Sequence, residues 1–158
     1  MNELMPGADS GRACRLPATN VQERFLFVER AGGRENDATV TFAWRLRGPI
    51  SESSVAEALR RIIERHEILR TRLVATETGI EQEVLAEAPF HLACLDLRAM
   101  PAKDRIERVH AIERDAAEEP MDPCRPGLFR ATLVKTGTDE AVLLGVAHHC
   151  IFDGQSTA

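Results

Sequence analysis

The chain has 158 residues, 44% of them hydrophobic and 28% charged, which is typical of one globular domain with a sizeable core. Its formal net charge of −5 argues against a nucleic-acid-binding protein, which needs a basic face to neutralise phosphates. The sequence has no apolar run of about eighteen residues that would span a membrane, and residues 1–9 lack the hydrophobic core of a signal peptide.

Hydrophobic periodicity and turn residues predict the elements in chain order. Residues 1–15 contain glycine and proline without periodicity, so we expect a flexible lead-in, followed by the domain over residues 16–158. The expected elements are a helix at 21–29, a strand at 38–47, a helix at 51–66, strands at 69–75, 81–85 and 91–95, a helix at 103–118, and strands at 128–135 and 141–147. Thr19 or Asn20 is the expected N-cap of the first helix, and Ser51 that of the second. Strands interleaved with three helices predict an α/β or α+β layered domain.

The strand predicted at 141–147 is apolar on both faces, so we expect it at the centre of a sheet, paired as a hairpin with the strand before it. It runs directly into His148 and His149, and adjacent strand residues point to opposite faces. His148 shares a face with the bulky Val146 and is expected in the core, where it would hold the loop. His149 shares a face with Gly145, which leaves space, and is expected to face a cleft. A neutral imidazole there suits proton transfer from an amine or alcohol that attacks an acyl group.

Asp153 and Gly154 follow the two histidines. The glycine permits a tight turn where the chain leaves the strand, and Asp153 could either orient an imidazole or pair with a buried arginine. A purely structural role is the common alternative for a histidine at a strand end. No third His or Cys lies at a usual ligand spacing, so we predict no metal site. A serine hydrolase is disfavoured because the chain has no G-x-S-x-G elbow.

The four cysteines occur at positions 14, 94, 124 and 150, and none belongs to a C-x-x-C motif. We therefore expect reduced thiols, mostly buried as small apolar residues, in a cytoplasmic protein. Disulfides in a secreted protein are the alternative.

The pattern H-H-x-x-x-D-G at residues 148–154 resembles the signature of the condensation domains of nonribosomal peptide synthetases, which belong to the chloramphenicol acetyltransferase-like superfamily. Residues 65–72, RHEILRTR, are similar to the R-H-E-x-L-R-T stretch of that family. Residues 46–50 also resemble its strand-to-helix junction. The resemblance covers residues 16–156, nearly the whole chain.

Residues 17–27 look like the first motif of the same family, whose core is A-Q-x-R-L-W. Gln22 and Arg24 match this core. Phe25 and Leu26 stand where the motif has Leu and Trp.

The resemblance implies the N-terminal lobe of a two-lobed chloramphenicol acetyltransferase-like fold, with a mixed sheet, flanking helices and a tunnel between the lobes. Carrier proteins would bring an upstream acyl or peptidyl thioester and a downstream amine to this tunnel on 4′-phosphopantetheine arms, so no cofactor is expected to bind the chain directly. His149 would act as general base or position the amine during amide formation. Asp153 would form a buried ion pair with Arg65 or Arg70, with Arg65 preferred, and Gly154 would leave room for the thioester.

A full domain of this family is more than twice as long, so we expect the second lobe to be absent and the chain alone to have little or no activity. Carrier proteins, the missing lobe and neighbouring synthetase domains are the expected partners. The alternatives are a stand-alone acyltransferase acting on a free alcohol or amine, an epimerisation domain, and a non-catalytic docking or scaffold module. A heterocyclising domain is disfavoured, because such domains replace the two histidines with aspartates. We favour catalysis because the motif is intact.

Overall fold

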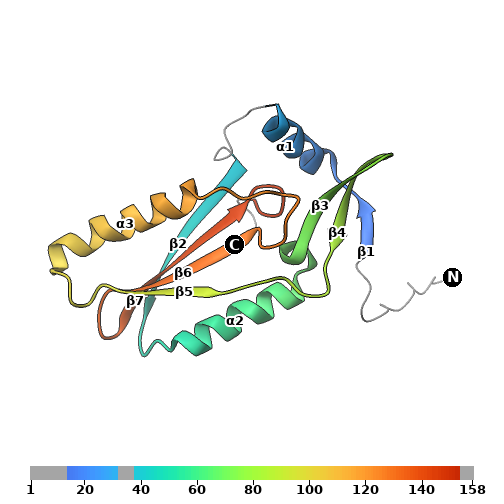
Figure 1. The fold of residues 1–158 in the computed structure, drawn as a ribbon. Helices are drawn as coiled ribbons and strands as arrows, with labels where there is room; N and C mark the ends of the chain where they lie inside the picture. Colours follow the sequence, from blue (N-terminus) through green and yellow to red (C-terminus); the bar gives the residue numbers. More distant parts are fainter. Residues whose placement is uncertain (1–13, 32–37, 154–158) are drawn as a thin grey trace.

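The computed structural model describes residues 14–31 and 38–153, which form two β-sheets and three α-helices (Figure 1). In chain order the elements are β1 (Cys14–Pro17), α1 (Asn20–Arg30), β2 (Thr39–Arg47), α2 (Glu52–Arg65), a 3-10 helix η2 (Glu67–Arg70), β3 (Thr71–Thr76), β4 (Gly79–Val84), β5 (Leu92–Asp96), α3 (Ala102–Glu118), β6 (Phe129–Lys135) and β7 (Glu140–His148). The prediction of a mixed α/β fold is confirmed.

The larger sheet has the strand order β2-β7-β6-β5. It is mixed, because β5 runs parallel to β6 while β2 and β6 both pair antiparallel with β7. β7 therefore has a partner on each side, as its apolar sequence predicts, and it forms the expected hairpin with β6. The motif histidines thus lie at the end of an interior strand of the sheet.

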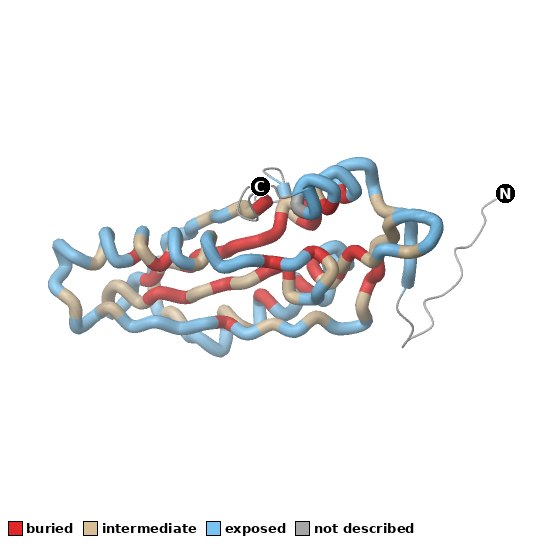
Figure 2. Tube along the Cα trace, turned by 45° about the horizontal axis from the view of Figure 1, so that its top comes forward, coloured by how far each residue is buried: buried red, intermediate tan, exposed pale blue. Residues whose placement is uncertain are grey.

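Helices α2 and α3 cover opposite faces of this sheet (Figure 1). Leu144 of β7 packs with Val109 and Ile112 of α3. The preceding residue, Leu143, lies in the cluster that contains Leu59 of α2. Successive strand residues point to opposite faces, so β7 is buried on both sides, and Figure 2 shows the buried positions concentrated along the inner strands.

Two of the helices begin with side-chain caps that the sequence indicates. Ser51 caps α2, and its side chain accepts a hydrogen bond from the Ser54 backbone N–H. Thr19, rather than Asn20, caps α1: its hydroxyl accepts from the Gln22 N–H at 3.3 Å. In return the Gln22 side-chain oxygen accepts from the Thr19 N–H at 2.8 Å, which completes a capping box.

The smaller sheet has the order β1-β4-β3, with antiparallel pairing throughout. Its middle strand carries Glu83, which lies directly across from Arg15 on β1 and Arg72 on β3. Both arginines form ion pairs with the Glu83 carboxylate, at 2.9 Å and 2.6 Å. The hydrogen bond from Arg72, with a smaller contribution from Arg15, holds the pKa of Glu83 below its usual value of 4.5, against the opposing effect of burial.

The structure corrects two predicted boundaries. Cys14 and Arg15, assigned to the lead-in, form the first half of β1, while residues 1–13 of that segment lie outside the described residues. The strand predicted from residue 69 begins only at Thr71, because the preceding residues form the 3-10 helix. Neither difference moves the strand that carries the motif.

All four cysteines are free thiols, but the expectation that most are buried is wrong. Cys150 is buried and Cys124 partly so, whereas Cys14 and Cys94 are exposed. Within residues 14–31 and 38–153, no helix is both long enough and apolar enough to cross a bilayer.

Candidate active site

The two motif histidines, at the end of β7 and directly after it, lie in different environments. His148 is 0% exposed, which confirms its predicted place in the core. Its ring Nδ1 accepts a hydrogen bond from the Cys150 backbone N–H at 3.1 Å. The backbone N–H of His148 donates to the Leu128 carbonyl at 2.9 Å. His149 is partly exposed, and its N–H donates to the Ala38 carbonyl at 2.6 Å, just before β2 begins. His148 therefore holds the loop from inside, while His149 is partly open to solvent.

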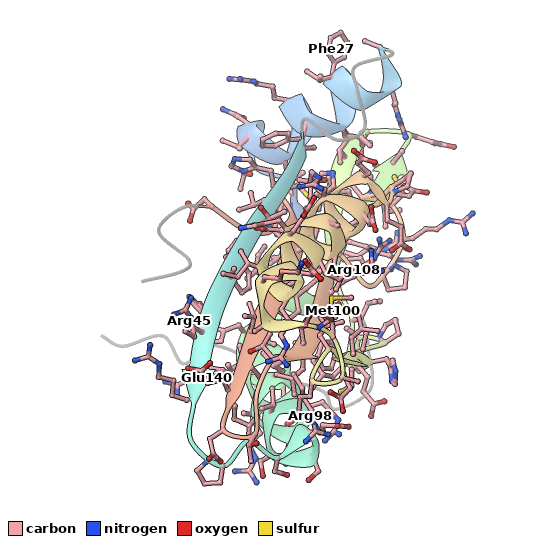
Figure 3. All side chains as sticks on the ribbon, turned by 90° about the vertical axis from the view of Figure 1, so that its left-hand side faces the viewer. Phe27, Arg45, Arg98, Met100, Arg108 and Glu140 are labelled. Carbon is pink, nitrogen blue, oxygen red and sulfur yellow. The ribbon has the colours of Figure 1, made fainter. Side chains whose placement is uncertain are left out.

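Helix α1 lies against the end of β7 that carries the motif (Figure 1). The Phe25 ring stacks on the His149 ring, with 4.9 Å between centroids and 21° between planes. The same phenylalanine meets His148 edge-on at 6.2 Å. Phe27 lies on the other side of α1, 72% exposed, and points away from the molecule (Figure 3). The inner face of α1 thus forms one wall beside His149.

The space expected beside Gly145 is filled. Phe42 of β2 lies directly across from Gly145 in the sheet, and a Cβ atom added at Gly145 would come within 2.0 Å of the Phe42 ring. The glycine therefore accommodates an aromatic ring of the core rather than opening a cleft. The ring also stacks on Phe152, with 5.5 Å between centroids, so it supports the motif loop as well.

An apolar pocket of about 300 Å³ lies beside the motif loop, on the α2 side of the larger sheet. Ile151 and Phe152 of the loop contribute to its wall. The other lining residues come from β2, α2, the 3-10 helix and β6 and are mostly apolar: Phe42, Trp44, Leu59, Ile62, His66, Ile68, Leu69 and Phe129. Trp44 and Ile62 are partly open to solvent, so this face presents apolar surface next to the candidate site.

The remaining predicted site residues are not gathered into one cluster. Arg70 donates to the Leu85 carbonyl and forms an ion pair with Glu67 at 3.3 Å. Arg65, the last residue of α2, is exposed, and so is Asp153. The burial expected for an Arg65–Asp153 ion pair is therefore not found in this chain, and the pair itself stays a prediction. Gly154 lies outside the described residues.

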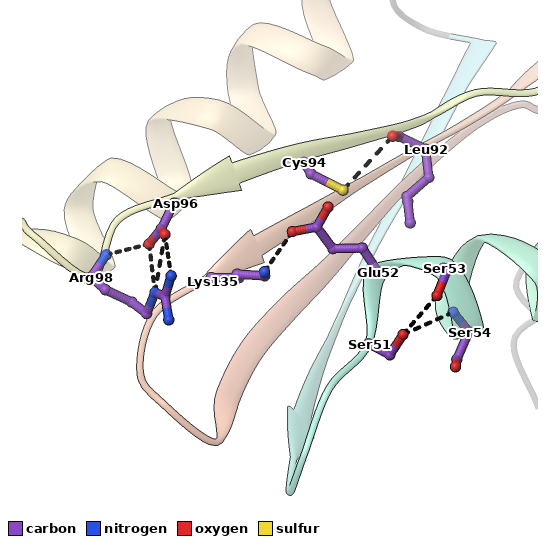
Figure 4. A network of polar contacts seen from close by, with 9 residues as sticks. All are labelled: Ser51, Glu52, Ser53, Ser54, Leu92, Cys94, Asp96, Arg98 and Lys135. Carbon is purple, nitrogen blue, oxygen red and sulfur yellow. Dashed lines mark hydrogen bonds and ion pairs between the residues drawn. The ribbon is translucent and has the colours of Figure 1, made fainter.

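A polar cluster lies at the end of the larger sheet opposite to the motif (Figure 4). Lys135 of β6 binds Glu52 of α2 at 2.5 Å, and this bond holds the pKa of Glu52 below its usual value. Arg98 forms hydrogen bonds to both carboxylate oxygens of Asp96 and depresses its pKa strongly. The Lys135–Glu52 contact attaches the start of α2 to the sheet, whereas the Arg98–Asp96 contact stays within the end of β5 and the loop after it. No group of three or more metal-binding side chains is found among the described residues.

The condensation-domain family model matches residues 13–158. This chain belongs to the condensation-domain family. It is 32% identical over 145 residues to one of the proteins that make up the linear gramicidin synthase of Brevibacillus parabrevis, a match that covers 92% of this chain and 3% of that protein. It is 36% identical over 160 residues to the cyclosporin synthetase of Tolypocladium inflatum, covering 98% of this chain and 1% of that protein.

Solved condensation domains share the fold of this chain. The first condensation domain of the calcium-dependent antibiotic synthetase, in complex with a substrate analogue, superposes with a TM-score of 0.82 at 21% identity, over 91% of this chain and 34% of that chain. The starter condensation domain of rhizomide synthetase gives a TM-score of 0.80 at 20% identity, over 90% and 35%. This condensation-domain chain therefore spans about a third of each of these two solved chains.

Two residues that contact the H-H-x-x-x-D-G motif in the structure are given no functional role by the sequence analysis. Gln22 stands out there only as a motif match, and Phe25 only as a departure from the motif. The T-x-x-Q spacing at residues 19–22 indicates a capping box, which could have predicted where α1 starts. Nothing local predicts that α1 then packs on residues 148–150, because those residues are more than a hundred positions away.

Proposed function

We propose that this chain supplies one lobe of a condensation domain that joins an upstream carrier-bound acyl or peptidyl thioester to a downstream carrier-bound amine, with His149 as the general base. The observation that carries the proposal is the different environment of the two adjacent histidines. His148 is enclosed, whereas His149, directly after the end of an interior strand, is a partly exposed residue. A proton acceptor needs such access to its substrate.

The chemistry requires one proton transfer at the attacking nitrogen. The amine nitrogen forms a bond to the thioester carbonyl carbon, and the carbon–sulfur bond breaks as the tetrahedral intermediate collapses. The His149 imidazole takes the proton that the nitrogen loses, and the departing phosphopantetheine thiolate recovers a proton. General-base catalysis of this kind contributes about 10²- to 10⁴-fold to a rate.

The chain spans about a third of the solved condensation-domain chains, so we propose that the tunnel is completed by a second lobe. Carrier proteins would present both substrates on 4′-phosphopantetheine arms, and the chain itself would bind no cofactor. Residues 1–158 alone are expected to give little or no condensation. Amide formation by the purified 158-residue chain with two loaded carrier proteins would contradict this expectation.

The test of the base uses a two-lobe condensation domain whose first lobe is residues 1–158, assayed by single turnover with loaded donor and acceptor carrier proteins. His149→Ala is expected to lower the rate about 10²- to 10⁴-fold. His110→Ala is the matched control, because His110 is an exposed histidine of α3 and its loss should leave the rate unchanged. Normal turnover by His149→Ala would rule out His149 as the general base and would favour a non-catalytic scaffold module.

A parallel assay separates amide formation on a carrier from transfer to a free acceptor. The loaded acceptor carrier is replaced by the same amino acid as a free amine, at equal and at hundredfold higher concentration. The proposed function predicts product only with the carrier-bound amine. Efficient use of the free amine would identify a stand-alone acyltransferase instead.

A further inference from the structure

We infer that Gln22 and Phe25 of α1 are positioning residues for His149. The motif at residues 17–27 would then act on catalysis through the H-H-x-x-x-D-G motif at residues 148–154. The inference rests on the proposed function. Gln22 and Phe25 are three residues apart in a helix, so both lie on the face that meets the motif loop. Gln22 binds the backbone next to His149, and Phe25 covers the His149 ring.

The orientation of the Gln22 amide is fixed by what surrounds it. The side chain is 4% exposed, and its oxygen lies 2.8 Å from the Thr19 backbone nitrogen, which can only donate. The amide nitrogen must therefore point the other way. It donates to the Cys150 carbonyl and to the Gln82 side-chain oxygen, both at 3.4 Å. One buried amide thus connects the start of α1, strand β4 and the residue that follows His149.

His149 is held from three directions. Its backbone N–H is bound to the Ala38 carbonyl at 2.6 Å. The residue after it, Cys150, is bound by Gln22 through its backbone carbonyl. Its ring lies against Phe25, with 21° between the two planes. The contacts with Gln22 and Phe25 restrict the loop and the ring respectively, and a base gains most when its geometry is set before the substrate arrives.

Gln22→Glu separates positioning from helix capping. The carboxylate keeps an oxygen that accepts from the Thr19 N–H, so the capping box is preserved. Its second oxygen replaces the amide nitrogen and faces the Cys150 carbonyl, where two acceptors repel each other. We expect kcat in the two-lobe domain to fall about ten- to a hundredfold with KM unchanged, because a displaced base slows the chemical step and leaves carrier binding intact.

Ser51→Ala is the matched control for Gln22→Glu. It removes an N-cap contact from α2 rather than from α1. Ser51 follows the end of β2 that pairs with Glu140, at the opposite end of β7 from His148. It should lower stability with no change in kcat. An equal loss of kcat in both variants would show that general destabilisation is the cause and would overturn the positioning role.

Phe25 is tested by removal and partial replacement. Phe25→Ala uncovers the His149 ring and should lower kcat about tenfold. Phe25→Leu restores an apolar cover, as in the family motif, and should recover most of that loss. If Phe25→Ala retains full kcat, or if Phe25→Leu is as slow as Phe25→Ala, the role assigned to Phe25 is wrong.

Proton NMR of the 158-residue chain tests the geometry without any turnover. The stacked phenylalanine should shift the His149 ring protons upfield, and this shift should disappear in Phe25→Leu. Absence of the shift, or of ring-to-ring nuclear Overhauser contacts, would overturn the stacking. If His149→Ala is inactive but Gln22→Glu and Phe25→Ala are fully active, the inference fails while the proposed function stands. If His149→Ala is fully active, the proposed function fails, and the NMR result still decides the geometry.

Discussion

In the larger sheet, Leu133 and Val134 are both 0% exposed and point to opposite faces, each into an apolar cluster. In the smaller sheet, the middle strand instead buries a carboxylate: Glu83 is 5% exposed and is bound by Arg15 and Arg72. Helices α2 and α3 cover the two faces of the larger sheet and exclude water from its centre. The second has three strands, and its arginines remain partly exposed. One sheet therefore depends on apolar burial and the other on charge.

The motif loop is attached to both sheets. It continues β7 of the larger sheet, and Gln22 connects it to Gln82 of the smaller one. The rigidity of the loop should consequently depend on the larger sheet, and its orientation should depend in part on the smaller sheet. Variants that act on one sheet at a time can test this division.

The largest effect is expected from Leu133→Ala in β6. Deleting a fully buried leucine removes apolar contacts and leaves a cavity, so the free energy of unfolding should fall by about 2–5 kcal/mol. Urea denaturation followed by circular dichroism measures the loss. Leu95→Ala on β5 is the control, since Leu95 is exposed and should cost much less. A loss below about 1 kcal/mol for Leu133→Ala would contradict the picture of a tightly packed larger sheet.

Gly145→Ala tests the same sheet by adding volume instead of removing it. The new methyl group would collide with the Phe42 ring, and overpacking of this kind costs about 1–3 kcal/mol. Phe42→Leu in the same chain should recover part of that cost, because the smaller side chain vacates the space above residue 145. Additive losses in the double variant, measured by the same denaturation, would show that the two positions do not interact.

Much of the larger sheet and two strands of the smaller one, β3 and β4, follow from local sequence pattern, whereas β1 and the wall beside His149 do not. The apolar run of β7 predicts an interior strand, and the alternation at its end separates His148 from His149. β1 has only four residues, and its side-chain contact from Arg15 reaches Glu83, 68 positions away, so no local pattern reveals it. The stacking of Phe25 on His149 depends in the same way on tertiary packing.

Glu83→Gln tests the charged sheet. The amide keeps the shape of the side chain but loses the negative charge that both arginines bind. We expect the free energy of unfolding to fall by about 1–2 kcal/mol, less than for a fully buried ion pair, because Arg15 is half exposed and stays solvated. Glu81→Gln is the control, since Glu81 is more exposed and lies 3.8 Å from Arg15. Equal losses in the two variants would mean that burial of Glu83 adds nothing.

The pH dependence of stability should differ between wild type and Glu83→Gln. The pKa of Glu83 is lowered in the folded protein, mainly by Arg72, so its contribution is fully present above the unfolded value of 4.5. That contribution is lost as pH falls through the folded pKa. The free energy of unfolding of the wild type should therefore decline more steeply from pH 5 to pH 3 than that of Glu83→Gln. Parallel curves would show that the carboxylate titrates normally in the fold.

The smallest effect concerns the Glu52 carboxylate of α2, which lies beside the larger sheet rather than in its core. Loss of water around the Cys94 thiol raises its pKa, and the neighbouring Glu52 carboxylate raises it further (Figure 4). Glu52→Gln removes that charge, so the thiolate fraction at pH 8 should increase and Cys94 should react faster with iodoacetamide. The increase in rate should be less than about tenfold, because loss of water around the thiol still raises its pKa.

Mass spectrometry can follow Cys94 and Cys14 in the same sample. The rate at Cys14 should not change, because that residue is on β1 of the other sheet. Glu57→Gln, five residues further along α2 and bound to Arg60 and Arg61, is the matched variant that should leave Cys94 unaffected. Faster reaction in both variants would point to fraying of α2 rather than to the charge of Glu52. A rise confined to Glu52→Gln would show that the Glu52 charge of α2 acts directly on the Cys94 thiol of β5.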